Sequence, residues 1–279
     1  QWREWILNQY GSYSAAEGVF GTAIPRDSDG SVIGLSDAQM NAAVASDCEV
    51  RLAAAYRRFL DDAVARYWNG IAGSIRAIDP NHMLGFRMTA LGSGEEGMYD
   101  LRSLAPVLDI MEPEGYILDS TEASCTKALF CNLYSRMVSP DTPIVWKEFG
   151  RSAWLGSNWR RDDAVAENIG KLYEYSLDAM LEGYSSGVYC WYFAGGYRVG
   201  EGSDYGIINP DGSDRPCTAV LRSYAERFRN MGKIPEPDVY ITVDRDEHAN
   251  GIIGIYNKIA QNLTSARREN RTVALVTSE

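Results

Sequence analysis

The chain has 279 residues, a formal net charge of −11 at pH 7 and a pI near 4.8. Such an acidic chain is poorly suited to bind nucleic acid or an anionic membrane surface, and no apolar run is long enough to cross a bilayer. The two histidines and five cysteines contain no Cys-x-x-Cys pair and no histidine cluster. Neither a metal site nor a disulfide framework is therefore indicated, and no cofactor is expected.

Amphipathic helices and short apolar strands alternate along the first 230 residues. Apolar residues recur at helical spacing in the segments 2–20 (interrupted near residue 11), 49–77, 104–108, 121–137, 162–182 and 217–230. Strand-like runs lie between them, at 83–89, 109–116, 143–150 and 187–193. The segment 21–47 is rich in Gly, Asp and Ser, which predicts a long loop or insertion.

Strands that alternate with helices indicate a parallel sheet with βα crossovers. The predicted fold is therefore α/β, a (β/α)8 TIM barrel of which this chain supplies about the last four βα units. A doubly wound sheet is the alternative, although no Gly-x-Gly-x-x-Gly loop supports it.

The predicted domain organisation has a barrel part at 1–232, a stiff Pro-containing linker at 233–238 and a second unit at 239–279. In the second unit, a strand at 239–243 precedes a helix that Asp244-Arg245-Asp246 is expected to cap, and a strand at 273–276 follows. This pattern predicts the start of a truncated flavodoxin-like α/β domain. The chain begins at Gln1 and ends just after an apolar run, so we expect an internal piece of a longer protein, and its localisation stays open.

The strand in Pro143-Ile-Val-Trp-Lys-Glu-Phe-Gly150 is short and apolar and ends on one carboxylate, Glu148. Polar residues at the C-terminal ends of barrel strands form the active site of a TIM barrel. The neighbouring predicted strands end near Tyr116 and Trp191. A carboxylate, a phenol and an indole together suit the binding and cleavage of a sugar. A solvated glutamate at a strand end is the plainer interpretation.

The order of these motifs resembles that of clan A retaining β-glycoside hydrolases, in particular families 5 and 42, over residues 1–230. The similar segments are Asp79-Pro-Asn-His82 before a strand, Asp109 to Tyr116, Pro143 to Gly150, Trp191, and Tyr205 to Pro216. The resemblance implies that this chain is the C-terminal half of the barrel, followed by the start of an α/β domain.

In such an enzyme Glu148 would be the nucleophile, Tyr116 would hold it by a hydrogen bond, and Trp191 would form the floor of the −1 sugar subsite. Glu114 stands where family 5 members carry His. The implied reaction is double displacement on a β-linked oligo- or polysaccharide. The family places its acid/base Glu at the end of strand four, which would lie upstream of residue 1, so this piece alone is expected to lack the general acid.

Glu112, in Met-Glu-Pro-Glu, is superficially similar to the acid/base motif. Only 36 positions separate it from Glu148, too few for the strands that the family places between the two carboxylates. Glu112 is therefore predicted to bind substrate, together with Glu114, Arg87, Trp154, Tyr197 and Asp204. The sequence is equally compatible with a structural ion pair for Arg87. It is also compatible with loop aromatics that only cover the mouth of the barrel.

Two other functions are compatible with the sequence. The first is a non-catalytic carbohydrate-binding or scaffold protein on a degenerate barrel. The second is a barrel aldolase with Lys147 as Schiff-base residue, which is disfavoured because alternation along a strand directs Lys147 away from the face of Glu148. The expected ligand is a β-linked carbohydrate. The sequence leaves two possibilities for a protein partner: further copies of this chain in a homo-oligomer, or a complementary chain that supplies the N-terminal half of the barrel.

Overall fold

The computed structural model describes residues 1–46, 49–87, 100–116, 122–155 and 160–278. Parallel strands lie side by side at its centre, β1 next to β2, β2 joined to β3 by single bridges, and β3 next to β6. Their bounds are Gly85–Arg87 for β1, Ile110–Glu112 for β2, Val145–Phe149 for β3 and Gly187–Cys190 for β6. This order follows the predicted succession of βα units.

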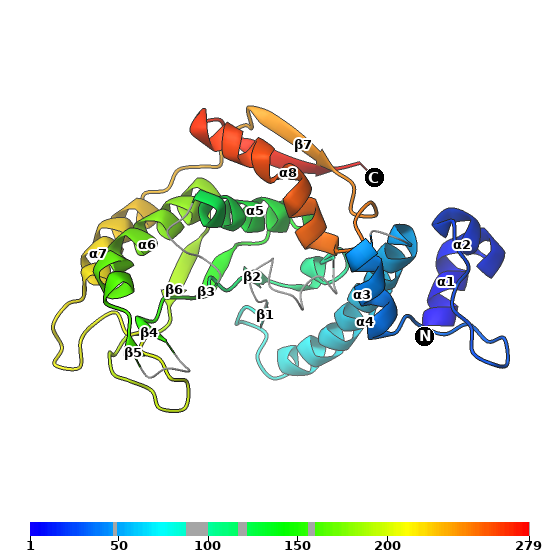
Figure 1. The fold of residues 1–279 in the computed structure, drawn as a ribbon, viewed down its shortest axis with the longest axis horizontal. Helices are drawn as coiled ribbons and strands as arrows, with labels where there is room; N and C mark the ends of the chain where they lie inside the picture. Colours follow the sequence, from blue (N-terminus) through cyan, green and yellow to red (C-terminus); the bar gives the residue numbers. More distant parts are fainter. Residues whose placement is uncertain (47–48, 88–99, 117–121, 156–159, 279) are drawn as a thin grey trace.

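Long helices cover the outer face of this curved sheet (Figure 1). They are α4 (Val50–Arg76), α5 (Glu122–Val138), α6 (Asp163–Glu182) and α7 (Pro216–Arg229), and a 3₁₀ turn spans Ala105–Val107. Each carries an apolar face that packs on the strands; the rings of Trp68 and Phe86, for example, lie 5.3 Å apart. Within the described residues, no helix combines the length and hydropathy of a membrane span.

The C-terminal segment forms one βαβ unit that packs on α5 (Figure 1). Its parallel strands are β7 (Val239–Val243) and β8 (Val273–Thr277), with α8 (Gly251–Arg268) between them. The ring of Tyr256 lies 5.4 Å from that of Phe130, which fixes α8 against α5. The proposed domain boundaries and the flavodoxin-like continuation stay predictions.

The helix expected directly after Asp244 is wrong in its start, because α8 begins at Gly251. The side chain of Asp244 instead accepts a hydrogen bond from the backbone of Asp246 at 2.8 Å. The next residues form a loop whose carbonyls, those of His248 and Ala249, accept hydrogen bonds from Arg57 of α4. A tertiary contact therefore keeps this segment out of the helix.

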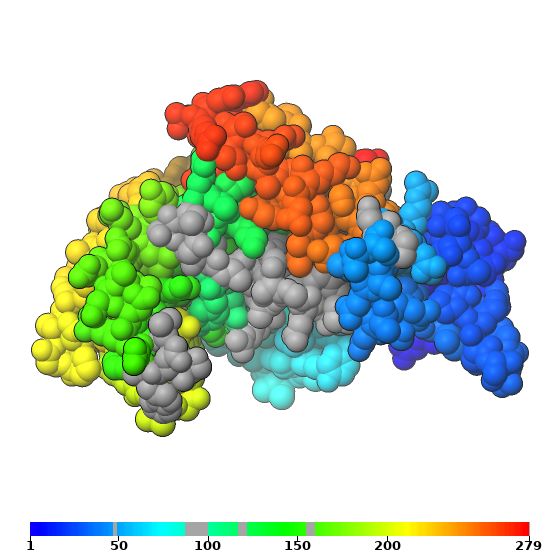
Figure 2. Space-filling view, in the orientation of Figure 1, coloured from blue at the N-terminus to red at the C-terminus, as the bar shows by residue number. Residues whose placement is uncertain are grey.

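At the N-terminal end, shown in blue in Figures 1 and 2, α1 (Trp2–Tyr10) and α2 (Tyr13–Phe20) meet at Gly11, whose φ of 76° ends the first helix. The expectation that 21–47 is a long loop is wrong in part, since α3 spans Asp37–Ser46. This helix has Ala43 as its buried residue, so its sequence carries no apolar stripe.

A cluster of buried charges joins α4 to the rest of the molecule. We call Arg57, Asp61 and Asp100 the Arg57 cluster; they are 1%, 0% and 5% exposed. The backbone N–H of Ser103 donates to Asp61 at 2.6 Å, and Tyr134 of α5 donates to the carbonyl of Asp100 at 2.9 Å. Because Arg57 also binds the loop before α8, this cluster joins α4, the segment 100–103, α5 and the C-terminal unit.

Candidate active site

Glu148 stands near the end of β3 and accepts a hydrogen bond from the hydroxyl of Tyr116, whose oxygen lies 2.5 Å from Oε2. Tyr116 follows β2, and the N–H of Gly115 donates to the carbonyl of Glu148 at 2.7 Å. Burial, the hydrogen bond to Glu148 and the charges of Glu148 and Glu114 raise the pKa of Tyr116 well above its ordinary value. The phenol thus stays a donor and holds the carboxylate in one orientation.

Strand β3 carries one residue more than β2 between two points of contact. Met111 pairs with Ile144 and Glu114 pairs with Glu148, so β2 advances three residues (114 − 111) while β3 advances four (148 − 144). The register between β3 and β6 also shifts within this stretch. An extra residue of this kind is a β-bulge, which re-aims the side chains of its strand.

Two aromatic side chains anchor the bulge to the helix layer. Trp146 Nε1 donates to Asn132 Oδ1 at 3.0 Å and to Ser185 Oγ at 3.1 Å. The ring of Phe149 lies 4.6 Å from that of Tyr173 on α6. Both aromatic residues of β3 are fully buried against the helices although they are three positions apart. The two residues between them therefore both face the inner side of the sheet.

Lys147 is one of these inner-facing residues, so the expectation that it points away from the face of Glu148 is wrong. Its Nζ lies 3.2 Å from Oε2 of Glu112, the last residue of β2. Gly85 of β1 gives this carboxylate room, because a Cβ there would collide with it. An ammonium group held in an ion pair is a poor nucleophile, and this contact now disfavours the aldolase alternative.

Glu114 lies deeper than the other carboxylates of the site. It is 2% exposed and forms the bridge to Glu148, whereas Glu112 is half-buried. Contact of either residue with a substrate stays a prediction.

Trp191 follows β6 on the inner face. Val188 and Cys190 pack into the core on the helix side, and Tyr189 between them is 68% exposed. The same alternation directs Trp191, as it does Tyr189, to the face that carries Glu148. Glu148 and Tyr116 are in contact, and Trp191 stands at the same end of the neighbouring strand; we call these three residues the Glu148 site.

The end of β3 and the residue Trp191 are in close backbone contact. The N–H of Trp191 donates to the carbonyl of Phe149 at 2.8 Å. A Cβ at Gly150 would collide with the carbonyl oxygen of Trp191. The guanidinium carbon of Arg198 lies 5.3 Å from the centre of the Trp191 ring. The sequence places Arg198 on a rim loop, and the structure adds its contact with the Trp191 ring.

Trp154 and Tyr197 form an aromatic pair on the loops at this rim, with ring centres 4.7 Å apart. Trp154 lies in β4 (Trp154–Leu155), which pairs with β5 (Arg160–Arg161) in an antiparallel hairpin. The two residues were predicted separately from the sequence, and the structure brings them together. Their role in sugar binding stays a prediction.

Asp204 is held by Arg215, a residue of the similar segment Tyr205 to Pro216 whose pairing with Asp204 the sequence did not predict. The guanidinium nitrogens lie 3.1 Å and 2.7 Å from the two carboxylate oxygens, and the N–H of Gly206 donates to one of them. Burial raises the pKa of Asp204, but these hydrogen bonds outweigh it and leave the pKa below its usual value. The contacts fix the loop after β6, and binding of substrate by Asp204 stays a prediction.

Arg87 is the last residue of β1 and pairs in register with Glu112. Its side chain lies outside the described part of the structure, and its role in binding stays a prediction. In the described residues no group of three or more His, Cys, Asp or Glu has the arrangement of a metal site.

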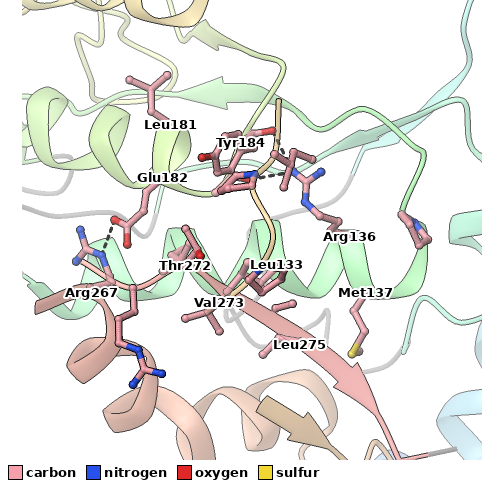
Figure 3. Close-up of a pocket in the computed structure, with 18 of the residues that line it drawn as sticks. Leu133, Arg136, Met137, Leu181, Glu182, Tyr184, Arg267, Thr272, Val273 and Leu275 are labelled. Carbon is pink, nitrogen blue, oxygen red and sulfur yellow. Dashed lines mark hydrogen bonds and ion pairs between the residues drawn. The ribbon is translucent and has the colours of Figure 1, made fainter. Parts of the chain in front are cut away.

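Two cavities accompany these elements in the described chain. A cavity of 570 Å³ lies between strands β4 and β5, the start of α6 and the loop after β6, and Trp154, Asp204 and Arg215 are among its lining residues. A larger one, of 920 Å³, lies between α5, the turn before β6 and β8 (Figure 3). There Arg136 donates to the carbonyls of Gly183 and Tyr184 at 3.0 Å. These contacts are structural and lie at the opposite end of the strands from Glu148.

No protein-family model and no curated protein matches the chain. Solved structures match it over most of its length. A polyextremophilic β-galactosidase from the haloarchaeon Halorubrum lacusprofundi matches with a TM-score of 0.69 at 16% identity, covering 99% of this chain and 43% of that one. GH5_18 from Streptomyces cattleya in complex with GlcNAc matches with a TM-score of 0.56 at 14% identity, covering 71% and 51%.

A GH5_18 variant from Streptomyces cattleya in complex with Manβ1-4GlcNAc matches with a TM-score of 0.63 at 12% identity, covering 88% of this chain and 68% of that one. The chain therefore spans about half the length of the first two structures. At these identities the likeness concerns the fold, and it confirms the predicted class: the chain has the fold of part of a TIM barrel, similar to that of clan A glycoside hydrolases.

Proposed function

We propose that this chain supplies the nucleophile half of the active site of a retaining β-glycoside hydrolase. The observation that carries the proposal is the 2.5 Å hydrogen bond from Tyr116 to Glu148, made across the ends of two adjoining parallel strands. A carboxylate held in this way is suited to attack an anomeric carbon. The inner-facing Trp191 supports the proposal because an indole stacks on the apolar face of a sugar ring.

In the first step, an oxygen of Glu148 bonds to the anomeric carbon while the bond to the leaving oxygen breaks. Tyr116 keeps the other carboxylate oxygen in place. A general acid protonates the leaving oxygen, then acts as base on the water that releases the sugar with retained configuration. We place that second carboxylate in the complementary half of the barrel, upstream of residue 1 or on a partner chain.

The substrate is proposed to be a β-linked oligo- or polysaccharide that Trp154, Tyr197, Asp204, Glu112, Glu114 and Arg87 help to bind. The matched structures are β-galactosidases or complexes with GlcNAc and Manβ1-4GlcNAc. Galactosides and mannosides are therefore the first probes.

The test is covalent trapping with dinitrophenyl 2-deoxy-2-fluoro-β-galactoside and its manno counterpart. Dinitrophenolate leaves without protonation, so the first step does not need the missing general acid, and fluorine slows release of the intermediate. We expect the protein to gain the mass of one fluoroglycosyl group on the peptide that contains Glu148. Glu148→Gln should gain none.

Tyr116→Phe should still be labelled on Glu148, at a rate lower by about 10- to 100-fold because the nucleophile is less well oriented. Tyr175→Phe, a substitution of a half-exposed tyrosine on α6, is the matched control and should label at the wild-type rate. Sugar binding without labelling would favour the carbohydrate-binding alternative. Label on any residue other than Glu148 would overturn the assignment.

A further inference from the structure

The extra residue in β3 has a second effect besides presenting Glu148. It brings the ammonium group of Lys147 to the same inner face, where a regular strand would have directed it to the helices. The anchors at Trp146 and Phe149 fix the bulge from the helix side, so this presentation is part of the folded strand.

Three carboxylates belong to the ends of two adjoining strands. Glu112 and Glu114 stand at the end of β2 and Glu148 at the end of β3. Their field reaches Tyr116, since the charges of Glu148 and Glu114 both contribute to its raised pKa. A cation at these strand ends would offset part of the negative charge of the three carboxylates.

Lys147 supplies a cation at this place. Its ion pair with Glu112 is partly shielded, the two side chains being 41% and 19% exposed. The clearance at Gly85 holds the Glu112 carboxylate in the interior beside it. Arg87 lies opposite Glu112 in the register, and Tyr205 packs on Tyr116 with ring centres 5.8 Å apart.

We propose that Lys147 is a positioning residue of the Glu148 site, whose ion pair with Glu112 places a compensating positive charge among the carboxylates at the ends of β2 and β3. This inference rests on the proposed function. It assigns to the bulge a chemical purpose: one inserted residue presents a nucleophile and its compensating charge side by side.

The first experiment measures the rate of fluoroglycoside labelling against pH in the full chain. Lys147→Met keeps the bulk and removes the charge, so the acid limb of the profile should move up by about one pH unit. Lys147→Arg should restore the wild-type limb. The double variant Glu112→Gln with Lys147→Met removes both members of the pair and should recover part of the shift.

Lys258→Met is the matched control, since Lys258 forms a pair with Glu247 at 2.9 Å on the surface. Its acid limb should equal that of the wild type. If folded Lys147→Met protein is labelled with an unchanged acid limb, the proposed role of Lys147 is wrong. The assignment of Glu148 as the nucleophile would not be affected by that result.

A second readout does not depend on labelling. Lys147→Met should lower the melting temperature more at pH 8 than at pH 4. At pH 8 the variant lacks the positive charge that offsets Glu112, Glu114 and Glu148. If no label forms on the wild type, the proposed hydrolase fails, yet a pH-dependent loss would still support charge compensation by Lys147. Equal losses at the two pH values would overturn it.

Discussion

The Glu148 site and the Arg57 cluster both gather ionisable side chains at junctions between elements, but they differ in access. Glu148 and Tyr116 are half-buried on the inner face of the sheet, whereas Arg57 and Asp61 are fully buried. Burial lowers the pKa of Arg57 to about 10, and burial with the charge of Asp100 raises that of Asp61 to about 8. Shifted pKa values therefore occur both in the Arg57 cluster, which is structural, and in the Glu148 site. The two differ in whether a ligand can reach the shifted groups.

The largest expected effect on stability belongs to the sealed cluster. Arg57→Met removes the buried donor that ties α4 to the carbonyls of His248 and Ala249, and it removes one of the two cations that the structure describes near Asp100, the other being Arg102. We expect a loss of about 3–5 kcal/mol in the free energy of unfolding, measured in urea. Arg66→Met, at an exposed position of the same helix, should lose less than about 0.5 kcal/mol. Similar losses in the two variants would contradict this picture.

Asp61→Asn tests the same cluster through pH. The pKa of Asp61 is higher in the folded than in the unfolded chain, so the wild type is favoured at low pH and loses stability as pH rises from about 4 through 8. Asparagine cannot ionise and still accepts from Ser103. The variant should match the wild type at pH 4 and exceed it by more than about 1.4 kcal/mol at pH 9. If the difference in unfolding free energy between the variant and the wild type were the same at pH 4 and pH 9, the raised pKa of Asp61 would be refuted.

Arg215→Lys should have a smaller effect, because lysine replaces a two-pronged contact with Asp204 by a single one. The expected loss is about 1 kcal/mol at pH 7. Since the pKa of Asp204 is lowered in the folded chain, the ion pair stabilises fully above the unfolded value of about 4, and the difference should shrink as the pH falls from there through the lower folded pKa. Urea unfolding at pH 7 and pH 3 measures both values.

The smallest stability effect is expected at the candidate nucleophile itself. Glu148→Gln keeps an acceptor for Tyr116 and adds no cavity, so the free energy of unfolding should change by about 0.5 kcal/mol or less. Thermal and urea unfolding check this. A large loss would place Glu148 among the structural residues, with the Arg57 cluster, and would weaken the proposed function.

Much of the fold was predictable because its helices bury one apolar stripe. The expected helices at 121–137 and 162–182 correspond to α5 at Glu122–Val138 and α6 at Asp163–Glu182. Helix α3 escaped prediction since it buries little more than Ala43. The start of α8 was wrong because Arg57, almost two hundred positions away in the sequence, binds the preceding loop.

The site was predictable in its residue types and not in its geometry. A carboxylate after an apolar strand indicated Glu148, and the resemblance to clan A hydrolases indicated Tyr116. The bulge was missed because a strict period of two was assumed along β3, although the spacing of three between Trp146 and Phe149 is its visible trace. The pairing of Asp204 with Arg215 left no local signal, as the two lie eleven positions apart across an irregular loop.

Gly150 shows how tightly the backbone constrains this site. Any larger residue there would push against the carbonyl of Trp191 and so separate the end of β3 from the residue after β6. In a saturation-mutagenesis library this loop position should accept glycine alone, although its side chain does no chemistry. A designer who transplants the Glu148 strand into another scaffold must therefore carry its neighbour's main chain along with it.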